Sequence, residues 1–235
     1  MIRKGFTLME LVLATLMFGF MMMSLASIYS TANRHMFQSY RQNIIKSNAS
    51  TAMKTITVRL SEANRVDAPI EGFSGNFLRF AVNVDQTSGC YPVNPAITPT
   101  WHYFCYIPKA GANCTPADCL LYYHTANYTG PGGGGCPSGG VTVPTYPLAF
   151  CGPGGGGAVT LLASWVYPDP ASPNPTLFSR TRPADGTLGN TLVTISLRVL
   201  WDPALAAAAG RDFRTAAHPI DTTLTTAVRV TRAGQ

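Results

Sequence analysis

Residues 1–28 read MIRKGFTLMELVLATLMFGFMMMSLASI, and this stretch decides the architecture of the chain. From Phe6 to Ile28 the run holds four hydroxyl residues, one glycine and one acid, Glu10, and its other residues are apolar. At about 1.5 Å per residue, a helix over this run is roughly 34 Å long, which is enough to cross a bilayer core of about 30 Å. The sequence therefore predicts a membrane-spanning helix at the N-terminus.

Glu10 separates the possible interpretations of this helix. A carboxylate that lies in hydrocarbon without a partner is disfavoured by several kcal/mol, so a functional role with a specific partner is the first hypothesis. Glu10 is the one charged residue between Lys4 and Arg34. We therefore expect its partner to come from another chain or from a newly exposed amine.

The sequence around this acid, RKGFTLMEL at residues 3–11, resembles the class III signal of type IV pilins and pseudopilins. The resemblance implies cleavage between Gly5 and Phe6 by a prepilin peptidase, N-methylation of Phe6, and work with an inner-membrane assembly platform. It also implies that Glu10 neutralises the N-terminal ammonium of an adjacent subunit in a filament. Met9 is the one departure, because a branched aliphatic residue is commoner there, and Met leaves the apolar helix surface intact.

Two other interpretations of the N-terminus are a cleaved secretory peptide and a signal anchor whose Glu10 reaches the cytoplasmic headgroups. A secretory peptide has a shorter apolar region followed by an Ala-x-Ala-like cleavage site, whereas this run continues to residue 30. Basic residues beside a first membrane helix tend to stay in the cytoplasm, so Arg3 and Lys4 place everything after Tyr29 outside. We expect a single-pass protein of the cytoplasmic membrane that then enters an extracytoplasmic filament.

The chain of 235 residues is long enough for one head beyond the membrane helix. We divide it into a leader (1–5), a membrane and assembly helix (6–28), a helical stem (29–66) and an extracytoplasmic β-rich head (67–235). The stem contains no proline or glycine, and Pro69 ends the helical pattern. Only 12% of all residues are charged, and 22 glycines and 18 prolines predict a head with many loops and little helix.

The stem carries two apolar faces. Phe37, Tyr40 and Ile44 follow helical spacing on one side. The second face, about a third of a turn away, comprises Ala52, Ile56, Leu60 and Ala63. We predict that the first face contacts neighbouring subunits and that the second lies on the head; one irregular face is the alternative.

The formal net charge of +6 is concentrated largely on this stem. A basic stem suits an anionic partner such as nucleic acid or lipid. We favour a solvated helix face near a negatively charged membrane surface over nucleic-acid binding.

Period-two alternation predicts β-strands throughout the head. The clearest runs are 78–84, 193–201 and a late run that contains Val228 and Val230. Shorter candidates are 101–107, 120–124, 159–167 and 177–182. A long N-terminal helix followed by many strands predicts an α+β fold, in which the stem lies across an antiparallel β-sheet.

Between residues 85 and 157 the alternation gives way to Pro, Gly, Cys and aromatic residues, which predicts a disulfide-rich loop insertion. All six cysteines lie there, in a compartment expected to be oxidising: Cys90, Cys105, Cys114, Cys119, Cys136 and Cys151. Fifteen pairings are possible. We hypothesise sequential pairing: Cys90 with Cys105, Cys114 with Cys119, and Cys136 with Cys151.

The hexapeptide GPGGGG occurs twice, at 130–135 and 152–157, beside the last predicted cysteine pair. It is either a displayed loop for a partner or a linker without a binding role, and we slightly favour the linker. Neither copy is followed by the Lys-Ser/Thr of a phosphate-binding loop.

No catalytic, cofactor or metal site is expected. The cysteines lack the paired C-x₂-C spacing of a zinc site. His102 and His124 lie in aromatic, strand-like runs, where we interpret them as packed side chains, and we interpret the neighbouring Trp and Tyr residues in the same way. We therefore expect a protein that is not an enzyme.

The function we expect is a structural subunit of a type IV pilus or of a secretion pseudopilus. The large head and its late strands resemble those of larger minor pilins or J-type minor pseudopilins. The alternative is a tip adhesin or DNA-binding minor pilin that acts through the cysteine-rich loop.

Overall fold

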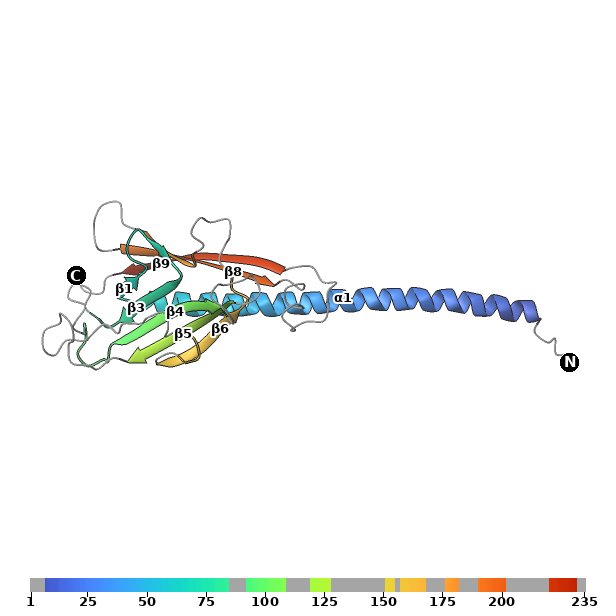
Figure 1. Ribbon diagram of the computed structural model, residues 1–235, viewed down its shortest axis with the longest axis horizontal. Helices are drawn as coiled ribbons and strands as arrows, with labels where there is room; N and C mark the ends of the chain where they lie inside the picture. Colours follow the sequence, from blue (N-terminus) through green and yellow to red (C-terminus); the bar gives the residue numbers. More distant parts are fainter. Residues whose placement is uncertain are drawn as a thin grey trace.

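One continuous helix, α1 (Leu8–Ser61), runs through the molecule, and its second half carries the head (Figure 1). The computed structural model describes residues 7–84, 92–108, 119–127, 151–154, 157–167, 176–181, 190–201 and 220–231. The first half of α1 projects away from the strands as a bare rod, while the second half lies among them. At about 1.5 Å per residue the helix is roughly 80 Å long.

The helix ends five residues before the predicted end at residue 66. The Ala63 amide donates to the Leu60 carbonyl at 3.1 Å in a tight last turn, and the Asn64 amide then donates to Ala81 at 3.1 Å. Residues Arg65–Ala68 form strand β1 instead of helix. The prediction was wrong here because a nearby strand offers these residues sheet hydrogen bonds, which is information that local helix propensity does not contain.

Within the described residues, nine strands form two antiparallel sheets. The first sheet has the order β1-β3-β4-β5-β6 and the second has the order β2-β7-β8-β9. The strands after β1 are β2 (Ser74–Gly75), β3 (Phe77–Val82), β4 (Thr100–Pro108), β5 (Cys119–Asn127), β6 (Ala158–Ser164), β7 (Phe178–Thr181), β8 (Asn190–Trp201) and β9 (Ile220–Thr231). A bridge between Val166 and Val199 links the end of the β6 segment to β8.

The α+β class and the strand positions are confirmed, because each predicted run coincides with a strand. Two details were wrong. The head contains two sheets rather than one. The segment 85–157 is not simply a loop insertion, since β4 and β5 lie within it as inner strands of the first sheet. Their aromatic and β-branched residues pack on both sheet faces, which favours strand despite the surrounding Gly and Pro.

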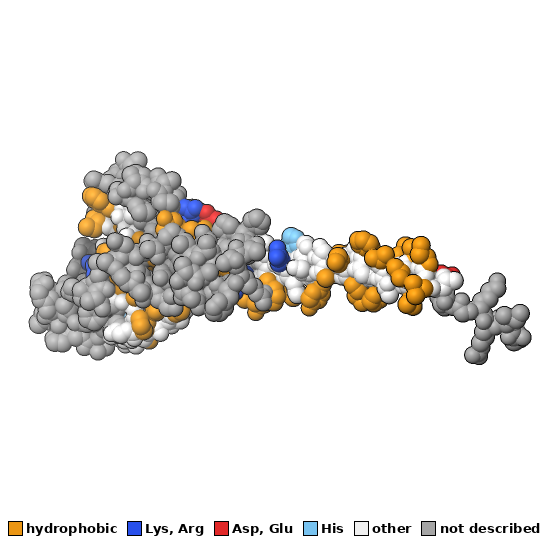
Figure 2. Space-filling view, turned by 45° about the vertical axis from the view of Figure 1, so that its right-hand side comes forward, with side chains coloured by type: hydrophobic (Ala, Val, Ile, Leu, Met, Phe, Trp, Pro, Cys, Tyr) orange, Lys and Arg blue, Asp and Glu red, His pale blue; other side chains and the backbone are white. Residues whose placement is uncertain are grey.

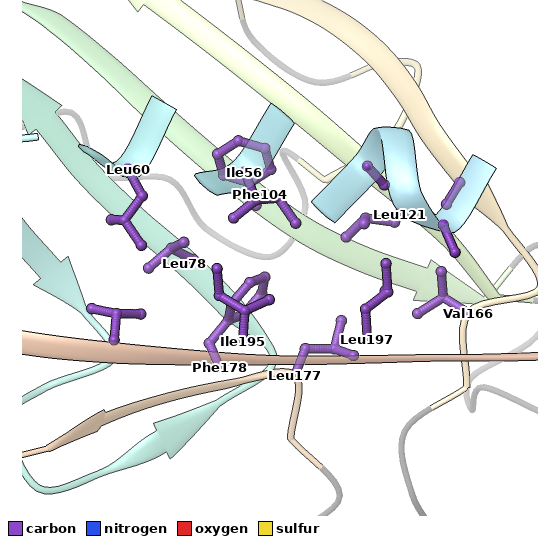
Figure 3. Packing of buried hydrophobic residues seen from close by; sticks show 14 of the residues in the cluster. Ile56, Leu60, Leu78, Phe104, Leu121, Val166, Leu177, Phe178, Ile195 and Leu197 are labelled. Atoms are coloured by element: carbon purple, nitrogen blue, oxygen red, sulfur yellow. The ribbon is translucent and has the colours of Figure 1, made fainter. Parts of the chain in front are cut away.

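The main core lies where α1 meets both sheets. The helix contributes residues at spacings of three and four: Ile45, Ala49, Ala52, Ile56 and Leu60. Figure 3 shows Ile56 and Leu60 facing Leu78 and Phe104 of the first sheet and Ile195 of the second. Since fully burying one large aliphatic side chain contributes about 1.5–3 kcal/mol, this seam holds the helix on the head.

Candidate functional site

The projecting half of α1 is a continuous apolar surface that nothing in the described part of the chain covers. Its large hydrophobic side chains are between 46% and 83% exposed: Leu8, Met9, Leu11, Val12, Leu13, Leu16, Met17, Phe18, Phe20, Met21, Met22, Met23, Leu25 and Ile28. Figure 2 shows hydrophobic side chains along this rod. Apolar patches of this extent mark contact with a membrane or with another protein. The helix is long and apolar enough to cross a membrane.

Two hydroxyl side chains in this half form hydrogen bonds within the helix. The Thr15 hydroxyl donates to the Val12 carbonyl at 2.9 Å, and the Ser24 hydroxyl donates to the Phe20 carbonyl at 3.0 Å. Such bonds spare the hydroxyls from lying unpaired in hydrocarbon. The helix is continuous through Gly19, where an added Cβ would meet no atom within 4 Å.

The helix begins with a capping box between Thr7 and Glu10. The Thr7 backbone N–H and hydroxyl both donate to Glu10 Oε2 at 3.0 Å, and the Glu10 N–H donates to the Thr7 hydroxyl at 3.3 Å. This reciprocal arrangement satisfies two amides that a helix start leaves unpaired. It also places a carboxylate in the first turn, where the helix dipole favours negative charge.

Thr7 is the residue that the sequence reasoning missed. The Thr-x-x-Glu spacing that precedes an apolar run is the sequence signature of a capping box. Glu10 therefore has hydrogen-bond donors in its own chain, and the expectation that every partner comes from elsewhere was too narrow. The predicted processing residues Gly5 and Phe6 lie outside the described residues, immediately before this cap.

The stem changes faces where it enters the head. Phe37, Tyr40 and Ile44, the first predicted face, are 36%, 63% and 41% exposed. The second face, which includes Ile56 and Leu60, is buried against the sheets as predicted. Contact between the first face and a neighbouring subunit stays a prediction.

A cation–π contact lies at the end of the head that is nearest to the projecting half of α1 (Figure 1). The Arg41 guanidinium carbon lies 4.9 Å from the centre of the Trp201 ring, at the end of β8. Arg41 thus joins the helix to the second sheet at the level where the exposed face gives way to the buried one. Interactions of this kind contribute about 0.5–2 kcal/mol.

The predicted sequential disulfide pairing is wrong, because Cys105 is bonded to Cys151. Neither the Cys90–Cys105 pair nor the Cys136–Cys151 pair can form beside this bond. Cys105 lies on β4, and Cys151, 46 residues further along the chain, packs with it in one buried cluster, so neighbours in space are not neighbours in sequence. Cys119 is also disulfide-bonded. Cys90, Cys114 and Cys136 lie outside the described residues, and the Cys114–Cys119 pair stays a prediction.

The two ends of the second glycine run lie against β5. The Gly152 N–H donates to His124 Nε2 at 3.2 Å. Gly157 has a φ of +80°, and a Cβ there would lie 2.4 Å from the Thr125 carbonyl oxygen. This conformation and close approach require glycine. The first copy of the run, 130–135, lies outside the described residues.

Both histidines are packed side chains, as predicted. His124 is completely buried, and His102 stacks on the rings of Phe80 and Tyr123. His102 Nδ1 lies 2.7 Å from the Tyr123 hydroxyl oxygen. Burial, with a smaller effect from Arg59, lowers the pKa of His102 from 6.5 to about 4.

No protein-family model, curated protein or solved structure matches this chain. The fold and the site nevertheless define a kind of molecule. It is an α+β head carried on one long helix, and the first half of that helix exposes an apolar surface suited to lipid or to other helices.

Proposed function

We propose that the chain is a structural subunit of a type IV filament, either a pilus or a type II secretion pseudopilus, and that it acts as a minor subunit. After a prepilin peptidase cuts between Gly5 and Phe6, the membrane-inserted helix passes from lipid into the filament with the help of the inner-membrane assembly platform. The single observation that carries the proposal is a helix with two kinds of surface. One half is buried in its own head, and the other half is apolar, exposed and begins with an acid.

The exposed half suits a helix that exchanges lipid for neighbouring helices. Lipid tails and leucine side chains are about equally apolar, so side-chain packing drives helix association in a membrane more than the hydrophobic effect does. A specific polar contact therefore has large influence on whether and where subunits join. Glu10 supplies the one acidic group in this half.

The capping box presents Glu10 for such a contact without leaving it unpaired beforehand. Both Thr7 donors use Oε2, and Glu10 is an exposed residue. An ionised carboxylate has about four lone-pair sites, so it retains capacity for an ammonium group while the cap is intact. The ammonium in this proposal is the new N-terminus of Phe6 on an adjacent subunit.

The test compares Glu10→Gln with Thr7→Ala in cells that assemble the filament. Gln can still accept the Thr7 amide hydrogen bond but carries no charge, whereas Thr7→Ala weakens the cap and keeps the charge. We expect Glu10→Gln to reach the membrane normally and to enter filaments at least about a hundredfold less, since removing one partner of a buried ion pair costs about 3–5 kcal/mol. Thr7→Ala should reduce incorporation far less. Normal incorporation of Glu10→Gln would refute the ion pair.

A further inference from the structure

A second cluster of chemically active side chains lies on the outer face of the first sheet, away from α1. Alternate residues of a strand point to opposite faces, so Phe104 and Leu121 face the main core while Tyr103, Cys105 and Tyr122 form a separate buried cluster. Cys151 covers this cluster from the segment that precedes β6.

Three potential metal ligands meet in this cluster. One donor atom from each of Cys105, His124 and Cys151 lies within 4.8 Å of the others, and all three residues are buried. In the sheet, Cys105 is opposite Tyr122 and His124 is opposite Tyr103, which places the cysteine and the histidine as diagonal neighbours on one face. Strand pairing, rather than sequence spacing, brings the three residues together, so a search for a C-x₂-C motif does not find them.

In the disulfide form, these three donor atoms are not available to a metal ion. The two sulfurs are bonded to each other, and the Gly152 N–H occupies His124 Nε2 at 3.2 Å. Cys151 and Gly152 are consecutive, so one short segment delivers both the second sulfur and the amide that blocks the imidazole. Reduction of this one bond removes the covalent link between that segment and β4.

We propose that, when this disulfide is reduced, Cys105, Cys151 and His124 form a binding site for a thiolate-preferring cation of the Zn²⁺ or Cu⁺ class. A phosphine or dithiol reductant supplies two electrons, the S–S bond breaks, and each sulfur takes up one proton. Binding of the cation then displaces those two protons as both thiols become thiolates. This proposal is independent of the filament function.

The cation class follows from the donors. Two thiolates and one neutral imidazole are a set that selects zinc or cuprous copper over magnesium or calcium. Around tetrahedral zinc, thiolates at about 2.3 Å lie roughly 3.8 Å from each other, so the sulfurs must move apart. Cys151 is the sulfur that can move, because it lies in the segment before β6 and not in a paired strand, whereas Cys105 is held within β4. Three protein ligands leave a fourth position for water or a small ligand.

The experiment titrates Co²⁺, a spectroscopic substitute for Zn²⁺, into the full chain in detergent micelles. The protein is reduced anaerobically with a phosphine, which is then removed. We expect a thiolate-to-cobalt charge-transfer band in the reduced wild type and no such band in the oxidised wild type. Zn²⁺ should displace the cobalt and abolish the band.

Three variants assign the site. His124→Gln keeps an acceptor for the Gly152 amide and should bind Co²⁺ at least tenfold more weakly, and Cys105→Ser should lose the same band. His102→Gln, a matched change of a buried histidine on the opposite face of the first sheet, should bind like the wild type. Near-ultraviolet circular dichroism checks that each head is folded. A band of equal strength and affinity in folded His124→Gln, or the absence of any band in the reduced wild type, would overturn the proposal.

Discussion

The two halves of α1 share one backbone conformation but differ in what surrounds them. Residues 8–28 are exposed on all sides, whereas Ile45 to Leu60 present a stripe that both sheets bury. Helix propensity and hydrogen bonding are common to the two halves, so neither explains the difference. The distribution of apolar residues does: they surround the first half, whereas in the second they recur at spacings of three and four.

The comparison teaches that hydrophobic residues in one helix can serve opposite purposes. In the second half, burial of the stripe is part of the stability of the head. In the first half, an apolar surface that its own chain leaves exposed is available for lipid or for other helices. The same substitution should therefore have different consequences in the two halves.

The largest contrast should come from placing one aspartate in each half. Ile56→Asp puts an unpaired charge into a fully buried position and should unfold the head, a loss above about 4 kcal/mol. Leu16→Asp, at a position that is 57% exposed, should leave the unfolding temperature of the head unchanged and reduce recovery in the membrane. Thermal unfolding in micelles, followed by near-ultraviolet circular dichroism, measures the first effect. Equal unfolding temperatures for both variants would contradict the claim that only the second half of α1 stabilises the head.

Loss of the Cys105–Cys151 bond should weaken the head and spare the rod. The bond closes a sequence separation of 46 residues, and replacing both cysteines with serine should cost about 2–4 kcal/mol. In guanidinium unfolding, the head of the double variant should unfold at a lower denaturant concentration than the head of the wild type. The helical signal of the projecting half should persist. An unchanged head transition in the double variant would contradict the structure of this face.

Acid should destabilise the head through His102, which lies on the sheet face that meets the buried half of the helix. The pKa of this side chain is about 4 in the folded protein, against 6.5 ordinarily. The unfolded chain therefore takes up the proton first as pH falls. The contribution of His102 to the free energy of unfolding is therefore fully present above pH 6.5 and declines as the pH falls towards 4. The decline amounts to about 3 kcal/mol in total.

The measurement for this group is the free energy of unfolding at pH 7 and at pH 4.5 in the wild type and in His102→Gln. Carboxylates titrate in both proteins, so the difference between them isolates the histidine. The wild type should lose more stability than the variant over this interval. Identical pH dependence would show that His102 is not held neutral by its surroundings.

The smallest effect should be at the start of the exposed half. Thr7→Ala removes a helix cap worth about 1 kcal/mol, so amides of the first turn should exchange with solvent roughly fivefold faster. Thr15→Ala is the matched control, because the Thr15 hydroxyl bonds to a carbonyl inside the helix and caps nothing. Equal exchange in the first turn of Thr7→Ala and the wild type would show that the cap does not hold the helix start.

The features that the sequence predicted are those set by local periodicity. The buried stripe through Ile56 and Leu60 follows helical spacing, and the alternation in 193–201 follows strand spacing, so both could be found from neighbouring residues alone. The capping box was also locally encoded, since Thr7 and Glu10 are three residues apart. The charge of Glu10 by itself does not reveal this cap, whereas its spacing from Thr7 does.

The features that the sequence did not predict depend on distant partners. Arg65 and Val66, predicted to be the end of the helix, belong to a strand because β3 is available to pair with them. The division into two sheets and the Cys105–Cys151 bond depend on strand order, which periodicity does not report. The cluster of His124 with these cysteines is likewise a product of the register between β4 and β5.

Mass spectrometry of the protein recovered from its native cells tests the central claim most directly, because the filament function requires a new amine at Phe6. We predict a mature chain that begins with N-methylated Phe6 and lacks residues 1–5. A chain that retains the intact sequence Met1 to Gly5 would contradict the account, because the ammonium that Glu10 is proposed to bind would not exist.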